Sequence, residues 1–254
     1  MSLVQSIVYT DSTQVLFPGN VGINILNNST KICTFDCPYC YLGPTEIKVN
    51  QIKSELQFLS VEEVVEALAS VLDERQALNK LPSAIEISGN GDPSLSSLLS
   101  EQIEAIRYER DKRSPKTRIL FLTNGGNLDN KKIIQSLQGV DEVIVKLDAG
   151  DDRNFNIANK PLIRVNVSRI ISACKSFENL SLQGHFFSGP NNNSSNEAIE
   201  EWIEVVGMIR PKKVYLMTTT QSPAVPDVLP VEEDLLYVIA SKLKRRTEIT
   251  AEVL

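Results

Sequence analysis

The stretch EVIVKLD, residues 142–148, separates two possible architectures. Apolar side chains occupy every second position, and Lys146 and Asp148 fall between them. A central strand of a doubly wound parallel sheet is buried on both faces and is therefore apolar nearly throughout. Alternation predicts instead that one face of this strand packs against helices while the other face lines a polar cavity, as in a barrel.

Two other stretches share this alternation: AIEIS at residues 84–88 and SLQGHFF at residues 181–187. If all three are neighbouring strands, their polar side chains point to one side of the sheet. We therefore expect a barrel lumen lined by Glu86, Ser88, Lys146, Asp148, Gln183 and His185.

Strand and helix patterns alternate along most of the chain, which predicts an α/β fold with parallel strands and right-handed crossovers. Expected strands are Gly22–Leu26, Ala84–Ser88, Arg118–Thr123, Glu142–Asp148, Ser181–Phe187 and Lys213–Thr218. Expected helices are Ser60–Leu72, Leu95–Arg107, Asn130–Leu137, Val167–Phe177, Asn196–Ile209 and Val231–Lys244. Serine followed three residues later by glutamate predicts capping boxes at Ser60–Glu63 and Ser194–Glu197.

No linker interrupts this pattern, so we predict one domain over residues 1–254, with a core at about 20–220 and a C-terminal helix at about 231–246. The chain has 26 basic and 32 acidic residues and a net charge of −6, which does not favour a protein built mainly to grip nucleic acid. Local basic runs at 107–113 and 242–246 are interpreted as solvated helix faces. With no signal-peptide pattern and no long apolar run, we expect a cytoplasmic location and no membrane association.

The stretch KICTFDCPYCYLGPT, residues 31–45, places Cys33, Cys37 and Cys40 within eight residues. Three nearby thiolates can hold three irons of a [4Fe–4S] cluster and leave the fourth iron open to another ligand. The alternative is a zinc site with Cys174 or His185 as fourth ligand, although structural zinc sites favour paired short spacings. Cys174 lies on the apolar stripe of an expected helix, where a buried free cysteine is ordinary packing.

The CxxxCxxC spacing with an aromatic residue before its last cysteine resembles the signature of the radical S-adenosylmethionine (SAM) superfamily. The resemblance implies a partial (β/α)6 TIM-like barrel whose [4Fe–4S] cluster is held by Cys33, Cys37 and Cys40. The cluster's open iron then binds SAM, and reduction cleaves SAM to a 5′-deoxyadenosyl radical that abstracts hydrogen from the substrate. Tyr39 is expected to pack near the adenine.

The segment SGNGDPSL, residues 88–95, resembles the GGEP motif of that superfamily, which holds the methionyl amino group. Aspartate replaces the usual glutamate, so the implied cofactor-binding residues are Gly89, Asn90, Gly91, Asp92 and Pro93. The segment LTNGG, residues 122–126, resembles a TNG segment near the ligand and adds Thr123 and Asn124, although an ordinary turn also fits.

The segment VKLDAG, residues 145–150, resembles a VSLDA segment that contacts the cofactor. Lys146 is the candidate partner of the SAM carboxylate, and Asp148 of ribose hydroxyls or a substrate donor; alternatively the two only neutralise one another. Gln183 and His185, the only histidine, end the fifth expected strand. We take Gln183 as cofactor-binding and Lys146, Asp148 and His185 as candidate catalytic residues, with a purely structural His185 as the alternative.

Several stretches resemble the wyosine-synthetase-like iron–sulfur oxidoreductases, among them CTFDCPYCYLGPT and TTTQSPAVPDVLPVEEDLL. Relatives in that branch modify a tRNA guanosine and carry a second cluster, for which this sequence has no further cysteine set. Three functions therefore stay open: a radical enzyme for a small polar substrate, a tRNA base-modifying enzyme, and an activase or electron-transfer partner of another protein. Each requires an electron donor such as flavodoxin or ferredoxin. We expect segments 151–161 and 189–196 to face the substrate.

Overall fold

The computed structural model describes residues 3–10, 14–26, 29–45 and 58–254. Six parallel strands pair in chain order, as the strand patterns predict. They are β2 (Val21–Asn24), β3 (Ala84–Ser88), β4 (Arg118–Thr123), β5 (Glu142–Lys146), β6 (Leu180–Ser188) and β7 (Lys213–Thr218). Because the order never reverses, the sheet has no switch point of the doubly wound kind. The partial (β/α)6 barrel is confirmed.

Short strands that the sequence patterns did not predict extend this sheet. At one edge β1 (Val8–Tyr9) pairs antiparallel with β2, and at the other edge β9 (Ala251–Val253) pairs parallel with β7. A third short strand, β8 (Leu229–Pro230), pairs antiparallel with the end of β6. Among the described residues β1 and β9 do not pair with one another, so the barrel stays open.

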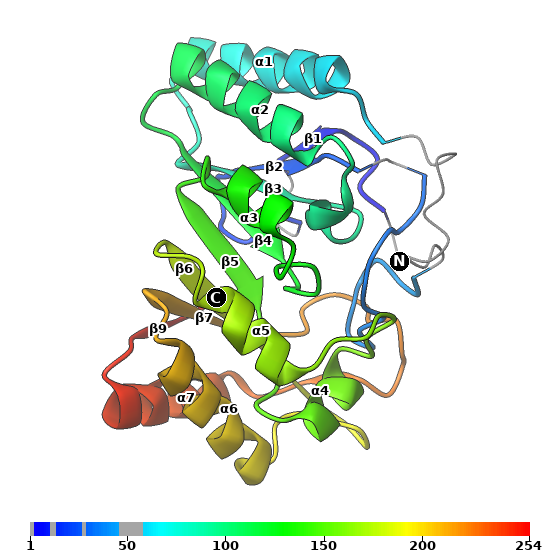
Figure 1. Cartoon of the computed structure of the whole chain (residues 1–254), viewed down its shortest axis with the longest axis vertical. Helices are drawn as coiled ribbons and strands as arrows, with labels where there is room; N and C mark the ends of the chain where they lie inside the picture. The colour runs from blue at the N-terminus through cyan, green and yellow to red at the C-terminus, as the bar shows by residue number, and fades with distance from the viewer. Residues whose placement is uncertain (1–2, 11–13, 27–28, 46–57) are drawn as a thin grey trace.

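Helices cover the outer face of the curved sheet and follow one another in chain order (Figure 1). They are α1 (Val61–Ala77), α2 (Leu99–Arg113), α3 (Lys131–Leu137), α4 (Asp152–Ala158), α5 (Val167–Cys174), α6 (Asn196–Ile209) and α7 (Glu233–Thr247). Their apolar faces and the outward strand residues form one core, in which Leu68, Ile87, Phe121, Val145 and Trp202 are almost fully buried.

The inner face of the sheet carries a separate apolar layer and, above it, the polar residues expected in a lumen. Ala84, Leu120, Ile144 and Tyr215 pack inside the barrel against Leu16 and Phe17, so segment 14–20 closes its lower end. Above this layer, Ser88, Lys146, Gln183 and His185 line one cavity, which confirms the lumen predicted from their alternation.

Glu86 is inward but not accessible to a ligand. Its carboxylate accepts hydrogen bonds from the backbone amides of Leu16 and Phe17, at 2.6 and 3.0 Å, and from Asn20 Nδ2 at 2.7 Å. Burial raises the pKa of Glu86, and these three hydrogen bonds oppose that rise. Glu86 therefore anchors the segment that closes the barrel, and its expected place in the substrate cavity is corrected.

Local rules explain where the helices begin, with two corrections. The capping box of Ser60 and Glu63 is present at α1. At α6 the helix begins at Asn196 as expected, but its cap is Ser195 instead of Ser194, whose amide donates to Asn192 Oδ1. Segment 151–161, expected as a loop, contains α4, capped by the Asp151 carboxylate.

The helix after β3 also differs from expectation. A 3-10 turn at Pro93–Leu95 comes first, and α2 begins at Leu99 instead of Leu95. None of the helices found among the described residues is both long and apolar enough to cross a membrane.

Candidate cofactor and substrate site

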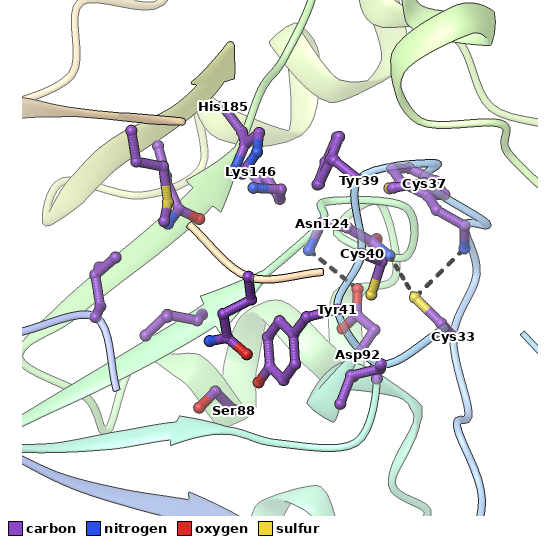
Figure 2. Close-up of a pocket in the computed structure, with 18 of the residues that line it drawn as sticks. Cys33, Cys37, Tyr39, Cys40, Tyr41, Ser88, Asp92, Asn124, Lys146 and His185 are labelled. Carbon is purple, nitrogen blue, oxygen red and sulfur yellow. Dashed lines mark hydrogen bonds between the residues drawn. The ribbon is translucent and has the colours of Figure 1, made fainter. Parts of the chain in front are cut away.

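The cysteine loop, residues 31–45, lies across the carboxyl end of the strands. Isolated β-bridges hold it on both sides, one between Ile32 and Gly91 and one between Phe35 and Pro161. All three loop cysteines line a cavity of about 260 Å³ inside the barrel mouth. Figure 2 shows Cys33 and Cys40 beside Asp92 and Asn124, with Lys146 and His185 across the same space.

All three loop cysteines are free thiols. Two of them, Cys33 and Cys37, are hard to ionise in the absence of a cation. Burial, aided by the negative charge of Asp148, raises the pKa of Cys37 to about 12. Burial, aided by Asp92, also raises the pKa of Cys33 well above its ordinary range. Thiols of this kind become thiolates when a metal centre supplies positive charge, so the donor set fits a cysteine-bound cluster.

Neither of the two residues considered as a fourth zinc ligand, Cys174 and His185, is placed to complete a zinc site with the loop cysteines. Cys174 packs in the outer core on α5 and does not line the cavity. The ring of His185 stacks on Tyr39, and its Nε2 lies 3.1 Å from the hydroxyl of Thr219. Within the described ranges, no three His, Cys, Asp or Glu side chains are gathered as a ready site for one metal ion.

The glycines at the end of β3 allow two backbone segments to meet. Gly91 has a φ of +137°, and a Cβ there would lie 1.7 Å from the carbonyl oxygen of Ile32. Gly89 has a φ of +110°, and its Cβ would lie 2.6 Å from the side chain of Asn24. The resemblance implied that both glycines bind the cofactor, and the contacts show that they also let the end of β3 reach the cysteine loop and β2.

Asp92 connects the ends of β3 and β4. Its buried carboxylate accepts from Ser94 N at 2.9 Å, the Thr123 hydroxyl at 3.0 Å and Asn124 N at 3.1 Å. Burial raises the pKa of Asp92, and these donors oppose the rise. The Ser94 hydroxyl is a further partner, so these donors hold the Asp92 carboxylate in place beside the cavity that it lines.

Asp148 is buried behind the cavity wall. It accepts hydrogen bonds from the Tyr39 hydroxyl, from Asn159 Nδ2 at 2.6 Å and from the amide of His185 at 2.9 Å. Lys146 Nζ is 3.8 Å from its Oδ1, which makes the weakest of these contacts. Asp148 thus joins the cysteine loop, β5 and β6, and it does not line the cavity.

Lys146 and His185 are the inward polar residues nearest to Asp148. Lys146 Nζ lies 4.9 Å from the centre of the Tyr39 ring and faces the cavity. The ring centres of Tyr39 and His185 are 4.1 Å apart, with an interplanar angle of 16°. Burial, aided by the charge of Lys146, lowers the pKa of His185 well below its ordinary value. On this side of the cavity the Lys146 cation therefore lies beside a neutral imidazole.

Most of the residues predicted for the site line this one cavity, and three do not. The lining set contains Cys33, Cys37, Tyr39, Cys40, Gly89, Gly91, Asp92, Thr123, Asn124, Lys146, Gln183 and His185. Asn90 is turned away: its Oδ1 accepts from Val4 N at 2.7 Å and its Nδ2 donates to Val4 O at 2.9 Å. Pro93 begins the 3-10 turn, and Asp148 lies behind the wall.

Sequence reasoning did not identify several residues of the cavity. Segment 14–16 forms part of its lining, and Thr218 at the end of β7 with the three residues that follow, 219–221, forms another part. Lys31, Tyr41 and Met217 also face it, and Gln183 Nε2 donates to the Met217 sulfur at 2.8 Å. The segment TTTQ, residues 218–221, begins at the end of an expected strand. Its position at a strand end was the feature from which a place in the site could have been predicted.

The fold and the site together define a class of protein, an open βα-barrel whose carboxyl end carries three cysteines beside a glycine-rich turn. A sequence profile of the Radical SAM superfamily matches residues 27–183, which is more than half of the chain. The chain belongs to the radical SAM superfamily. Superfamily membership gives a [4Fe–4S] cluster and SAM as its cofactors.

The curated relatives share about a quarter of their aligned residues with this chain and are longer than it. A protein named GTPase Obg from Brachyspira hyodysenteriae is 27% identical over 206 residues, which cover 80% of this chain and 28% of that protein. The UPF0026 protein slr1464 of Synechocystis sp. is 25% identical over 195 residues, covering 74% of this chain and 66% of the relative. The chain thus spans less than two-thirds of the length of either relative.

Solved structures share the fold at low sequence identity. A radical SAM methyltransferase from Sphaerobacter thermophilus superposes with a TM-score of 0.68 at 15% identity, over 94% of this chain and 67% of that one. SuiB from Streptococcus suis bound to S-adenosylmethionine gives 0.65 at 15% identity, over 94% and 51%. TYW1 with a lysine-pyruvate adduct bound gives 0.63 at 16% identity, over 90% and 74%.

Proposed function

We propose that this radical SAM enzyme acts on a small polar substrate bound in the barrel mouth between Lys146, His185 and Thr219, as an oxidoreductase or lyase. The observation that carries the proposal is the single cavity that the loop cysteines share with these polar residues. When bound, the cluster and SAM supply the radical that removes a substrate hydrogen.

The residues of the chain divide the remaining tasks. Cys33, Cys37 and Cys40 would hold the cluster, and Asp92 would accept from the methionyl ammonium of SAM. Lys146 would pair with the carboxylate of SAM. Its side chain points into the barrel and is 20% exposed in the cavity, so its ammonium can reach a ligand there. Catalytic roles for Lys146 and His185 belong to the proposal, whereas Asp148 serves to position them.

Modification of a tRNA base is the second candidate, supported by the structural likeness to TYW1 and by the sequence resemblance to wyosine-synthetase-like proteins. The charge distribution disfavours it. In the run 107–113, Arg110 and Arg113 pair with nearby carboxylates, and in the run 242–246, Lys242 and Arg246 pair with Glu200. Basic groups already neutralised in this way contribute little to phosphate binding.

The test is carried out on protein reconstituted with iron and sulfide under anaerobic conditions. After reduction, release of 5′-deoxyadenosine is measured with a small-metabolite extract and, separately, with bulk tRNA. Stimulation by the metabolite extract alone supports the proposal, and stimulation by tRNA alone replaces it with base modification. A cytoplasmic location and flavodoxin or ferredoxin as the electron donor are part of the same proposal.

A further inference from the structure

Lys31 places a buried charge beside the cysteine loop. Lys31 is only 3% exposed. Its Nζ donates to the carbonyl oxygen of Gly43 at 2.6 Å, and this hydrogen bond connects the two ends of the loop. Within the parts of the chain that the structure describes, no carboxylate lies within ion-pair distance of this ammonium group. A lysine is rarely buried without a negative partner.

The groups that face this ammonium are the cysteines. Lys31 lines the same cavity as all three cysteines. A negative centre held by the three sulfurs would therefore lie near the charge of Lys31.

Two side-chain amides act on the same sulfurs from other parts of the fold. Asn124 Nδ2, after β4, lies 3.4 Å from Cys33 Sγ. Asn159 Nδ2, after α4, lies 3.7 Å from Cys37 Sγ. Lys31 lines the same cavity as these sulfurs, so one cation and two side-chain amides lie around the three cysteines.

We propose that Lys31, Asn124 and Asn159 are positioning residues that raise the reduction potential of the bound cluster. The inference rests on the proposed function, since it requires the loop cysteines to hold that cluster. Reduction adds one electron from the external donor and makes the centre more negative, without transferring a proton or breaking a bond. A fixed positive charge and hydrogen bonds to the sulfurs favour the more negative state.

The test is a redox titration of reconstituted protein with dithionite, followed by electron paramagnetic resonance of the reduced cluster. Lys31→Gln keeps a donor for Gly43 O but removes the charge, and Lys31→Arg keeps the charge. We expect at least a tenfold lower ratio of reduced to oxidised cluster for Lys31→Gln at a fixed applied potential, about 59 mV for a one-electron couple. Lys31→Arg should titrate close to the wild type.

Iron and sulfide content are measured for every variant. Asn159→Ala, outside the cysteine loop, should shift the potential in the same direction by less, and it decides the outcome where a Lys31 variant assembles no cluster. Equal midpoint potentials for the wild type, Lys31→Gln and Asn159→Ala at equal cluster content would overturn the inference and leave the proposed function standing. A wild type that assembles no cluster would instead refute the proposed function.

Discussion

The Tyr39 hydroxyl donates a hydrogen bond to the Asp148 carboxylate, and this contact ties the cysteine loop to the end of β5. Asp148 is 1% exposed, and Tyr39 is 6% exposed. Burial, and next the charge of Asp148, raise the pKa of Tyr39 well above its ordinary value. The phenol therefore stays protonated and serves as a permanent donor to the buried carboxylate.

Removal of this hydroxyl should destabilise the fold. Tyr39→Phe leaves Asp148 buried with one donor fewer, and we expect a loss of about 1–3 kcal/mol in the free energy of unfolding. Urea denaturation of the cluster-free chain measures it. Tyr237→Phe is the matched control, because Tyr237 donates to Glu233 on an exposed face of α7. Equal losses in the two variants would contradict a structural role for the Tyr39–Asp148 contact.

Gly91 should tolerate no side chain. Gly91→Ala places a Cβ against the Ile32 carbonyl oxygen, and we expect it to cost at least about 4 kcal/mol or prevent folding. Gly19 also has a positive φ, of +86°, but no atom lies within 4 Å of its Cβ position. Gly19→Ala should therefore cost only the backbone penalty of about 1–2 kcal/mol. Unfolding midpoints of the two variants that coincide would show that the bridge to the cysteine loop is not required.

The buried neutral His185 should make stability depend on pH. Its pKa lies well below the ordinary 6.5 because of burial and the charge of Lys146. Below pH 6.5 the unfolded chain binds a proton that the folded chain does not bind. Stability from this residue is thus complete above pH 6.5 and is lost as the pH falls, by up to about 1.36 kcal/mol per pH unit.

His185→Gln tests this dependence directly, because His185 is the only histidine of the chain. Urea denaturation between pH 7.5 and 5.0 should show the wild type losing stability more steeply than the variant below pH 6.5. Carboxylates that titrate in this range contribute equally to both proteins, so their effect cancels in the difference. Parallel pH profiles would mean that His185 has the same pKa in the folded and unfolded chains.

The strand signals allowed the barrel to be predicted, but not the way in which its lower end is closed. Alternation at Lys146 and His185 placed both in the lumen, because side-chain direction in a strand follows from position alone. Glu86 obeys the same rule and still lies outside the ligand cavity, since segment 14–20 covers it. That contact spans about seventy positions of the chain, and no local pattern encodes it.

The cofactor motifs were predictable as positions but not as contacts. Asn90 lies inside a matching motif, yet its side chain binds Val4. Asn159 belongs to no motif and contacts both Asp148 and Cys37. Lys31 is two residues before Cys33, but its relation to the cysteines becomes visible only when the loop folds back on Gly43.

Lys146 should contribute to binding of SAM through its carboxylate. Its ammonium is 3.8 Å from Asp148, too far for a strong direct hydrogen bond. Lys146→Met should weaken the equilibrium binding of SAM to the reconstituted protein about 10- to 100-fold, because a charge-assisted hydrogen bond contributes about 1.5–3 kcal/mol. Lys146→Arg should recover part of the affinity. Unchanged affinity in Lys146→Met would mean that Lys146 only neutralises Asp148 or acts on the substrate.

The most direct test compares Cys37→Ala with Cys174→Ala after anaerobic reconstitution. Iron content, the visible absorbance of the cluster and 5′-deoxyadenosine release on reduction with SAM are measured for both. Both cysteines are buried and free, but only Cys37 faces the cavity. We predict that Cys37→Ala loses the cluster and all SAM cleavage, while Cys174→Ala retains both. SAM cleavage at the wild-type rate by Cys37→Ala, or its loss only in Cys174→Ala, would contradict a cluster held by the three loop cysteines.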